Sequence, residues 1–308
     1  MLYFERVCKV VIENRARISI EHCKIKFEII KSYMAKDNTA KVEIYNLGRD
    51  TRELITQADS LVTVYAGHLK NTGLVAIGSG DITRVQTNRD KTEVVTEMYL
   101  AEGIKRVRTN PISFAFAFNS NATLSVILKE ITKQTKINFK ILETNENTKI
   151  KMGYSDAGSF DHVLDNLAIE FGFSWSIQNG LCIIKGTNEV KRREVLVLSS
   201  QTGLILHPES VKKVSRRLAK SDISKLGKNI RSVQTLLQPK VQIHDVVKLE
   251  SQDINGLFEV QKITHIGDTR GNDWYTNMEI TPLGQGKGNL TPTDSQALTD
   301  KLSVVDYL

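Results

Sequence analysis

The stretch that decides the fold is Lys41-Val-Glu-Ile-Tyr-Asn-Leu-Gly-Arg-Asp-Thr-Arg-Glu-Leu-Ile55, followed closely by Leu61-Val-Thr-Val-Tyr-Ala-Gly67. Apolar and polar residues alternate at the start of the first segment and along the second, as in half-buried β-strands. Between them, Asn46–Arg49 predicts a turn, after which Asp50 or Thr51 can cap a short helix. The stretch therefore predicts a strand, a very short helix and a second strand, and it carries no catalytic pattern.

Length and composition indicate a globular protein with more than one domain. The chain has 308 residues, of which 40% are hydrophobic and 25% are charged. That length favours two or three domains. No apolar run approaches the roughly 18 residues of a bilayer-spanning helix. Charged residues interrupt Met1–Lys9, so we expect no signal peptide, no membrane insertion and folding in the cytoplasm.

The three cysteines do not form a recognisable pattern. Cys8, Cys23 and Cys182 are far apart in the sequence and lie on strand-like segments. This odd number without close spacing argues against a disulfide framework and against a zinc site. We expect all three to behave as small buried hydrophobic residues.

The chain carries a formal charge of +7, with local excess in Lys191–Arg193 and Lys212–Lys220. Such runs are usually solvated surface, but they also suit an acidic protein partner or a nucleic acid passing through a conduit. Because aromatic residues are not interleaved with them, we expect no sequence-specific reading of DNA or RNA.

The first section of the chain, up to about residue 103, reads as all-β and favours a closed or sandwiched barrel. Its predicted hairpin loop is Thr87–Lys91. The predicted strands are Val7–Glu13, Ile18–Ile30, Thr39–Tyr45, Leu61–Tyr65, Gly73–Gln86 and Thr92–Leu100.

The middle section, about 106–190, predicts a small α/β module. Residues 121–131 and 159–172 each place apolar side chains on one helical face. Ser159 is a natural N-cap and Gly172 a natural residue to end the second helix. The dipeptide Asn179-Gly180 then predicts a tight hairpin between two alternating strands.

A third section resumes the β pattern. Strands are predicted at Val195–Leu198, Ile230–Leu236, Val246–Glu250, Leu257–His265 and Trp274–Pro282, and Lys212–Gly227 reads as a long loop. From Gly284 the composition is that of a linker, and Ser295–Leu308 reads as a short helix or an extended tail.

The two β sections share a pattern that suggests internal duplication. Thr83 followed by Thr96-Glu-Met-Tyr-Leu100 parallels Thr264 followed by Thr276-Asn-Met-Glu-Ile280, with a one-residue difference assigned to the hairpin loop. A chance similarity between two strand pairs is the alternative.

A search for chemistry yields no catalytic, cofactor-binding or metal-binding residues. The histidines lack metal-ligand spacing, and they are His22, His68, His162, His207, His244 and His265. His162 is expected to face solvent, whereas His244 and His265 are expected in loops or the core. Gly78-Ser-Gly80 fits a β-bulge or a close strand approach better than a phosphate loop.

Carboxylate pairs are also present, but their placement favours structural roles. Glu21 with Glu28 and Asp161 with Asp165 are the clearest, and the second pair is expected on an exposed helical face. Nothing in the sequence locates a cleft between them, as a glycosidase would need. We therefore expect a protein that is not an enzyme.

The quoted stretch resembles the signature "IYNLS…TR…I…G…V.V.AGY" of bacteriophage tail baseplate hub proteins. Residues 236–283 resemble the end of the same proteins, through Pro239–Asp245, Ile254–Phe258 and Ile263–Asp268. His244 stands where Gly is usual, which affects only the local turn. With the hairpin at 173–180, the likeness spans most of residues 40–283.

The resemblance implies a mainly β fold with two tube-like β-barrel domains flanking a central α/β domain. The implied boundaries are 1–105, 106–190 and 191–283, with a C-terminal tail at 284–308. It further implies a homotrimer whose six barrels join a hexameric tail tube to a trimeric central spike. Implied partners are the tail tube protein, the spike protein, other baseplate proteins and the tape measure protein, in the tail baseplate of a virion assembled in the host cytoplasm.

Three other functions stay open at this point. A tail-tip cell-wall hydrolase would require a cleft with an acid and a base. A ring component of a secretion system would share the α/β module. The hub of a phage-tail-like contractile injection system would be indistinguishable by sequence.

Overall fold

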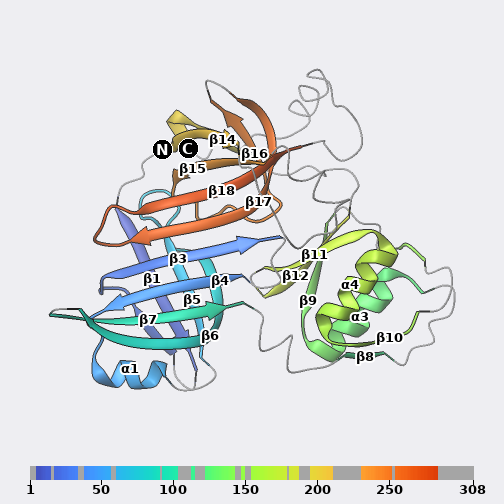
Figure 1. The fold of residues 1–308 in the computed structure, drawn as a ribbon, viewed down its shortest axis with the longest axis horizontal. Helices are drawn as coiled ribbons and strands as arrows, with labels where there is room; N and C mark the ends of the chain where they lie inside the picture. The colour runs from blue at the N-terminus through green and yellow to red at the C-terminus, as the bar shows by residue number, and fades with distance from the viewer. Residues whose placement is uncertain are drawn as a thin grey trace.

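The computed structural model describes residues 5–14, 17–33, 38–56, 60–90, 92–102, 112–114, 122–142, 147–149, 154–178, 180–186, 195–210, 230–251 and 254–283. Within these ranges the chain is mainly β, with a small α/β module beside one large sheet (Figure 1). This is the predicted fold class. No helix in the described ranges is long and apolar enough to cross a membrane.

The large sheet runs through both β sections of the chain. β16 (Val246–Glu250) pairs with β17 (Asn255–Asp268), and β13 (Leu196–Ser199) pairs in parallel with β16. The main path, in spatial order, is β14 (Leu204–Ser210), β15 (Arg231–Leu236), β18 (Trp274–Pro282), β17 (Asn255–Asp268), β3 (Ile25–Ser32), β4 (Thr39–Tyr45), β7 (Glu93–Ala101), β6 (Val75–Asp90), β5 (Leu61–His68), β1 (Arg6–Glu13) and β2 (Arg17–Ile20).

This order contains the same four-strand block twice. Strands β14-β15-β18-β17 form one block and β3-β4-β7-β6 the other, with β17 of the first adjoining β3 of the second. All neighbouring pairs within the blocks are antiparallel. We call the β strands up to residue 102 the first β module and those from residue 195 the second.

The long hairpins of the two blocks share a bulge at the same place. Met98 and Met278 are both buried, and they lie opposite Val85 and Ile263. The extra residue of the bulge precedes each of these partners by two positions, at Thr83 in one hairpin and Gln261 in the other. Equivalent bulges, with equivalent buried methionines, agree with an internal duplication.

The register corrects part of the match made from the sequence. Thr96 and Thr276 are equivalent, but they lie opposite Thr87 and His265, so Thr264 corresponds to Gln86 and not to Thr83. The strands of the first hairpin also continue to Asp90 and Glu93, which makes the predicted loop Thr87–Lys91 too long. From Thr87 to Thr96 is 9 residues and from His265 to Thr276 is 11, so the loop of the second hairpin is longer by two residues. Both hairpins carry the same bulge, so this loop difference, which the sequence match did not assume, is what displaced the register.

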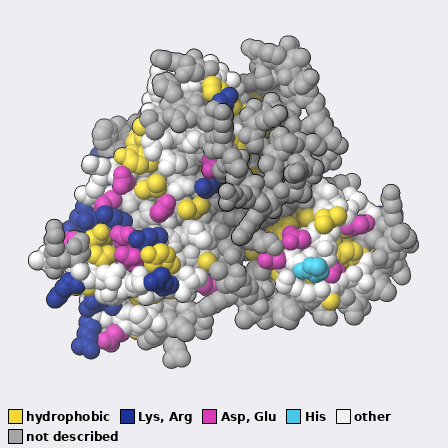
Figure 2. Space-filling model, viewed as in Figure 1, with side chains coloured by type: hydrophobic (Ala, Val, Ile, Leu, Met, Phe, Trp, Pro, Cys, Tyr) yellow, Lys and Arg dark blue, Asp and Glu magenta, His cyan; other side chains and the backbone are white. Residues whose placement is uncertain are grey.

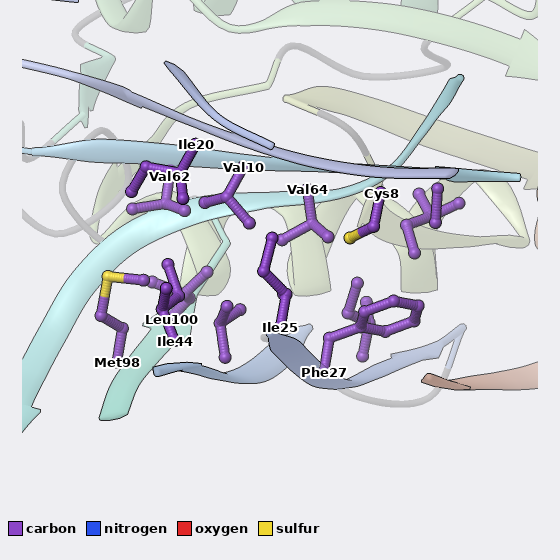
Figure 3. Close-up of a cluster of buried hydrophobic side chains, with 14 of the residues drawn as sticks. Cys8, Val10, Ile20, Ile25, Phe27, Ile44, Val62, Val64, Met98 and Leu100 are labelled. Atoms are coloured by element: carbon purple, nitrogen blue, oxygen red, sulfur yellow. The ribbon is translucent and has the colours of Figure 1, made fainter. Parts of the chain in front are cut away.

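The core of the first β module lies between two strand layers (Figure 3). Val10 and Val64 project from β1 and β5 toward Ile25 and Ile44 of β3 and β4, and all four are fully buried. Cys8 lies in the same layer, where burial raises the pKa of its thiol to about 12. The free cysteines Cys8 and Cys182 are buried as predicted, whereas Cys23 is only partly buried.

The opening stretch forms β4, the helix α1 (Arg49–Ile55) and β5, as predicted. The expected cap is wrong, because Gly48 is the N-cap residue and no side chain bonds the free amides. Asn46 has the left-handed conformation, with φ of 57°. Its backbone donates to Val94 O at 2.7 Å and its side-chain oxygen accepts from Val94 N at 3.0 Å, so this residue joins the turn to β7.

The α/β module has its own apolar core, built by α3 (Leu124–Thr135) and α4 (Phe160–Phe171) against a short sheet. Ser159 accepts a hydrogen bond from His162 N and Gly172 ends α4 in the left-handed conformation, both as predicted. The sheet consists of β9 (Asn138–Leu142), β11 (Phe173–Gln178) and β12 (Leu181–Gly186), and β8 (Ile112–Phe114) pairs with β10 (Asp156–Gly158).

Several sequence predictions differ from the structure or fall outside it. The predicted strand Ile18–Ile30 is two strands, β2 and β3, and the 3₁₀ turn η1 (Ser200–Thr202) and β14 were not predicted. The basic run Lys191–Arg193, the loop Lys212–Gly227 and the tail from residue 284 lie outside the described residues. The domain boundaries at 105, 190 and 283 stay predictions.

The outer face of the β3-β4-β7-β6 block carries basic side chains that form ion pairs with neighbouring acidic side chains. Figure 2 shows basic and acidic side chains intermingled over the end of the sheet near α1. Lys41 contacts Glu43 at 2.6 Å and Glu97 at 3.4 Å. In the β14-β15-β18-β17 block, Lys262 contacts Glu279 at 3.5 Å. The face therefore balances its charges locally.

Candidate functional site at the junction of the modules

The two β modules are joined by a continuous ladder between β17 and β3, which we call the seam. It pairs antiparallel from Lys262 opposite Ser32 to Asp268 opposite Lys26. Gly267 lies opposite Phe27 on the inner face, and a Cβ on Gly267 would lie 2.2 Å from Phe27 Cζ. A glycine at this position lets the Phe27 ring pack directly over the backbone of the other module.

The tip of the β17–β18 hairpin is fastened to the first β module by polar contacts. Thr269 N donates to Ile25 O, and Ile25 N donates to Thr269 Oγ1, both at 3.0 Å. Asp268 lies 3.6 Å from Lys26 Nζ. Arg6 donates to Gly271 O at 2.6 Å. These contacts fix the hairpin tip against the neighbouring block.

Apolar side chains cross the seam as well. Trp274, at the start of β18, is buried in the core of the first β module together with Leu237. Its ring meets Phe27 edge to face, with centroids 5.5 Å apart, and Arg6 lies over it at 5.5 Å. Two apolar side chains of the second β module thus complete the core of the first, which favours a rigid junction.

The ionisable side chains of His265 and Lys31 are buried at the seam. Burial lowers the pKa of His265 to about 3, helped by the charge of Lys31, so its ring is neutral near pH 7. The ring Nδ1 and Thr276 Oγ1 are 3.0 Å apart. Burial also lowers the pKa of Lys31, while the carboxylate of Glu102 opposes that shift.

The α/β module rests on the first β module through Glu102, which we call the first seat contact. Glu102 Oε1 accepts from Gly180 N at 2.8 Å, and its Oε2 accepts from Asn38 Nδ2 at 2.7 Å. Asn38 Nδ2 also lies 3.0 Å from Ile177 O and 2.8 Å from Gln178 Oε1. All these groups belong to, or receive, the turn of the β11–β12 hairpin.

A second seat contact joins the α/β module to the second β module. Lys185 of β12 forms an ion pair with Glu259 of β17. Glu259 Oε1 also lies 2.8 Å from His244 Nδ1, and the His244 ring meets Tyr33 edge to face at 5.7 Å. Burial would raise the pKa of Glu259, but its bond to His244 and the charge of Lys185 outweigh that and lower it.

His244 stands where the hub pattern that the sequence resembles has Gly, and its backbone conformation is one that suits Gly. Its φ is 71°, in the left-handed region that glycine adopts without cost. Histidine is one of the few other residues found there with some frequency. The bond to Glu259 and the packing on Tyr33 give this side chain a role that glycine would lack.

The remaining sequence candidates do not converge on a catalytic site. His162 is 59% exposed on α4, as predicted, and Asp165 accepts from Trp175 Nε1 at 3.0 Å. Glu21, just after β2, pairs with Lys9 at the surface, and Glu28 is exposed on β3. Within the described ranges, no group of three His, Cys, Asp or Glu side chains could hold a metal ion.

Gly78-Ser-Gly80 is a site of close strand approach, as predicted. A bulge in β6 separates Gly78 from Ala76, and a Cβ on Gly78 would lie 2.8 Å from the side chain of Ile29. A Cβ on Gly80 would lie 3.0 Å from the backbone of Ala101.

The residues of the junction were not identified from the sequence. Glu102, Asn38 and Glu259 come from segments far apart in the chain, and they are single polar residues without motif spacing. A polar residue at an inward position of a strand is the one available signal, and Lys31 gives it in the alternating segment Ile25–Ser32. His244, at a usual Gly position, is a second signal.

The same fold occurs in known tail proteins. No family model matches the sequence, and no curated protein matches it. A tail protein from Neisseria meningitidis MC58 is similar over 95% of this chain and 99% of its own, with a TM-score of 0.65 and 10% identity. The 43 kDa tail protein of prophage MuSo2 from Shewanella oneidensis is similar over 89% and 97%, with a TM-score of 0.58 and 13% identity.

A third similar structure belongs to a secretion machine. It is a type VI secretion system component from E. coli, described as structurally similar to the T4 tail proteins gp27 and gp5. It matches 88% of this chain and 76% of its own, with a TM-score of 0.54 and 11% identity. The chain therefore has the fold of these phage tail proteins and of this type VI secretion component.

Proposed function

We propose that the protein is the structural baseplate hub of a phage tail, a homotrimer whose six four-strand blocks form a ring between a hexameric tail tube and a trimeric central spike. The observation that carries the proposal is the seam, because it joins the two equivalent blocks within one chain. Repeating that junction between chains would give three chains a pseudo-six-fold ring.

The chain offers the two strand edges that such a junction needs. The C-terminal half of β17, Lys262–Asp268, pairs with β3 at the seam. The equivalent half of β6, Arg84–Asp90, pairs with β7 on one side, and among the described strands none covers its other side. β14, the equivalent of β3, is the opposite end of the sheet. We infer that β6 of one chain pairs with β14 of the next.

An open edge of this kind supports assembly for a physical reason. Unpaired backbone amides and carbonyls along a strand are a template for pairing with another chain. In a closed ring, every copy of the edge is paired and none remains to extend the assembly. The ring would then contact the tail tube protein, the spike protein, other baseplate proteins and the tape measure protein in a virion tail. This role requires no catalytic site.

A second candidate is the hub of a phage-tail-like contractile injection system. The similarity to the type VI secretion component favours it, because that protein shares the fold at a TM-score of 0.54. The ring geometry would be the same in both machines. The tail-tip hydrolase has no such support, since the carboxylates singled out in the sequence do not face one another across a cleft.

The proposal is tested by the mass of the protein in solution and by prolines in the open edge. Successive residues of a strand direct their N–H groups to opposite sides, so of Asn88→Pro and Arg89→Pro one removes a bond to β7 and the other blocks only the open edge. We expect a trimer for the wild type and a folded monomer for the variant that blocks only the open edge. A wild-type monomer that stays monomeric with tube and spike proteins present would overturn the proposal.

A further inference from the structure

The α/β module meets the β modules without sharing an apolar core. Within the described residues, the module's hydrophobic cluster contains only residues between Ala122 and Ile184, and the clusters of the β modules contain none of these. The two β modules, in contrast, share Trp274 and Leu237 across the seam. The attachments of the two kinds of module therefore differ in physical character.

Hydrogen bonds and an ion pair hold the α/β module on the β modules. At the first seat contact, Glu102 and Asn38 receive the β11–β12 turn through Gly180 and Gln178. Gln178 Nε2 also donates to Ser32 O at 3.2 Å, where the seam ends. At the second seat contact, Lys185 meets Glu259. Together the contacts span the end of the seam, one on each β module.

Polar contacts of this kind can be exchanged for water at small net cost, unlike a shared apolar core. A hydrogen bond inside the protein replaces one to water, so its net contribution is much smaller than its gross strength. Interfaces between domains that are small and polar permit relative motion by default. The α/β module has its own apolar core and a capped α4, so it can stay folded when the two seat contacts are broken.

We propose that the α/β module is a releasable rigid body, seated across the end of the seam by the Glu102 and Glu259 contacts and able to leave that seat while all three modules stay folded. The protein then has two arrangements, one with the α/β module in contact with the β modules and one with it released, and the β modules are the same in both. This inference stands on the contacts within one chain and does not depend on trimer formation.

Spin labels report the position of the module directly. Ile169 on α4 is 83% exposed and Leu69 in the first β module is 59% exposed, so both accept a label at an introduced cysteine. The native Cys8 and Cys182 are buried, and Cys23→Ser removes the accessible thiol. We expect one narrow distance distribution for this otherwise wild-type protein at neutral pH.

The test variants remove the seat contacts. In E102A/K185M/E259Q we expect a second, longer and broader distance population, with the hydrogen exchange of α3, α4 and the seam strands unchanged. The matched control is K248M/E250Q, which removes a Lys–Glu pair of 2.8 Å within β16 and should leave the distribution narrow. E102A and K185M/E259Q, made separately, should each give a smaller second population.

Two results would overturn the proposal. One is a narrow distance distribution that stays unchanged in the triple variant. The other is loss of exchange protection in α3 and α4 together with the change in distance, because the module would then unfold and not move as a body.

Discussion

Gly267 of β17 lies directly opposite Phe27 of β3, so the aromatic ring of one β module packs on the bare backbone of the other. This pair lies near the end of the seam at the β17–β18 hairpin tip, next to Trp274. The junction between the modules therefore depends on a residue without a side chain. In the proposed ring, the intrachain seam is one of two kinds of junction, and it can be studied in a single chain.

The first prediction concerns this pair. Gly267→Ala should lower the free energy of unfolding by about 1–3 kcal/mol, as overpacking does in a close-packed site. Phe27→Leu in the same chain should restore part of the loss. The measurement is urea denaturation, and Gly48→Ala is the control because a Cβ there meets nothing within 4 Å. Equal stability of Gly267→Ala and Gly48→Ala would contradict the packing argument.

A second prediction follows from the turn in the opening stretch. Asn46→Ala should cost about 2 kcal/mol, because it removes the acceptor for Val94 N and places alanine in the left-handed conformation. Asn46→Gly loses only the side-chain bond and should cost about 1 kcal/mol. Equilibrium unfolding of both variants checks the order, and a greater loss for Asn46→Gly would refute it.

The third prediction is a dependence on acid pH through Glu259. Its pKa in the folded protein is lowered from the ordinary value of 4.5, so its contribution is complete above that value. The contribution is lost as the pH falls through the lowered folded pKa, since protonation removes the pairing with Lys185 and His244. Glu259→Gln should be less stable at pH 7 and show a flatter decline below pH 4.5. Identical acid limbs for the two proteins would count against this role.

The fourth prediction concerns the buried His265. Its pKa is near 3 in the folded protein, against an ordinary value of 6.5, so the unfolded chain binds an additional proton between these values. Stability should therefore rise with pH across that window, by up to about 1.4 kcal/mol per pH unit from this group. His265→Gln should remove this component, whereas His162→Gln at an exposed position should not. The check is the unfolding free energy measured at pH 5 and pH 7 for each protein.

Local patterns predicted most elements of the fold, for identifiable reasons. Alternation gave β4 its bounds, and the apolar stripe with Ser159 and Gly172 gave α4 its ends, because periodicity and caps act over a few residues. Prediction was weaker where neighbouring strands decide. The bulge at Thr83 and the register of the hairpins depend on partners that the sequence does not display.

The sequence by itself determined a mainly β protein with a small α/β module and a hub-like signature, since side-chain periodicity and turn residues are local properties. Only the tertiary structure decided that the two blocks join at β17 and β3 in one sheet. It also decided that Glu102, Asn38 and Glu259 form the seat of the module. Those relationships bring together residues far apart in the chain, and they arise from packing and backbone pairing that no local pattern encodes.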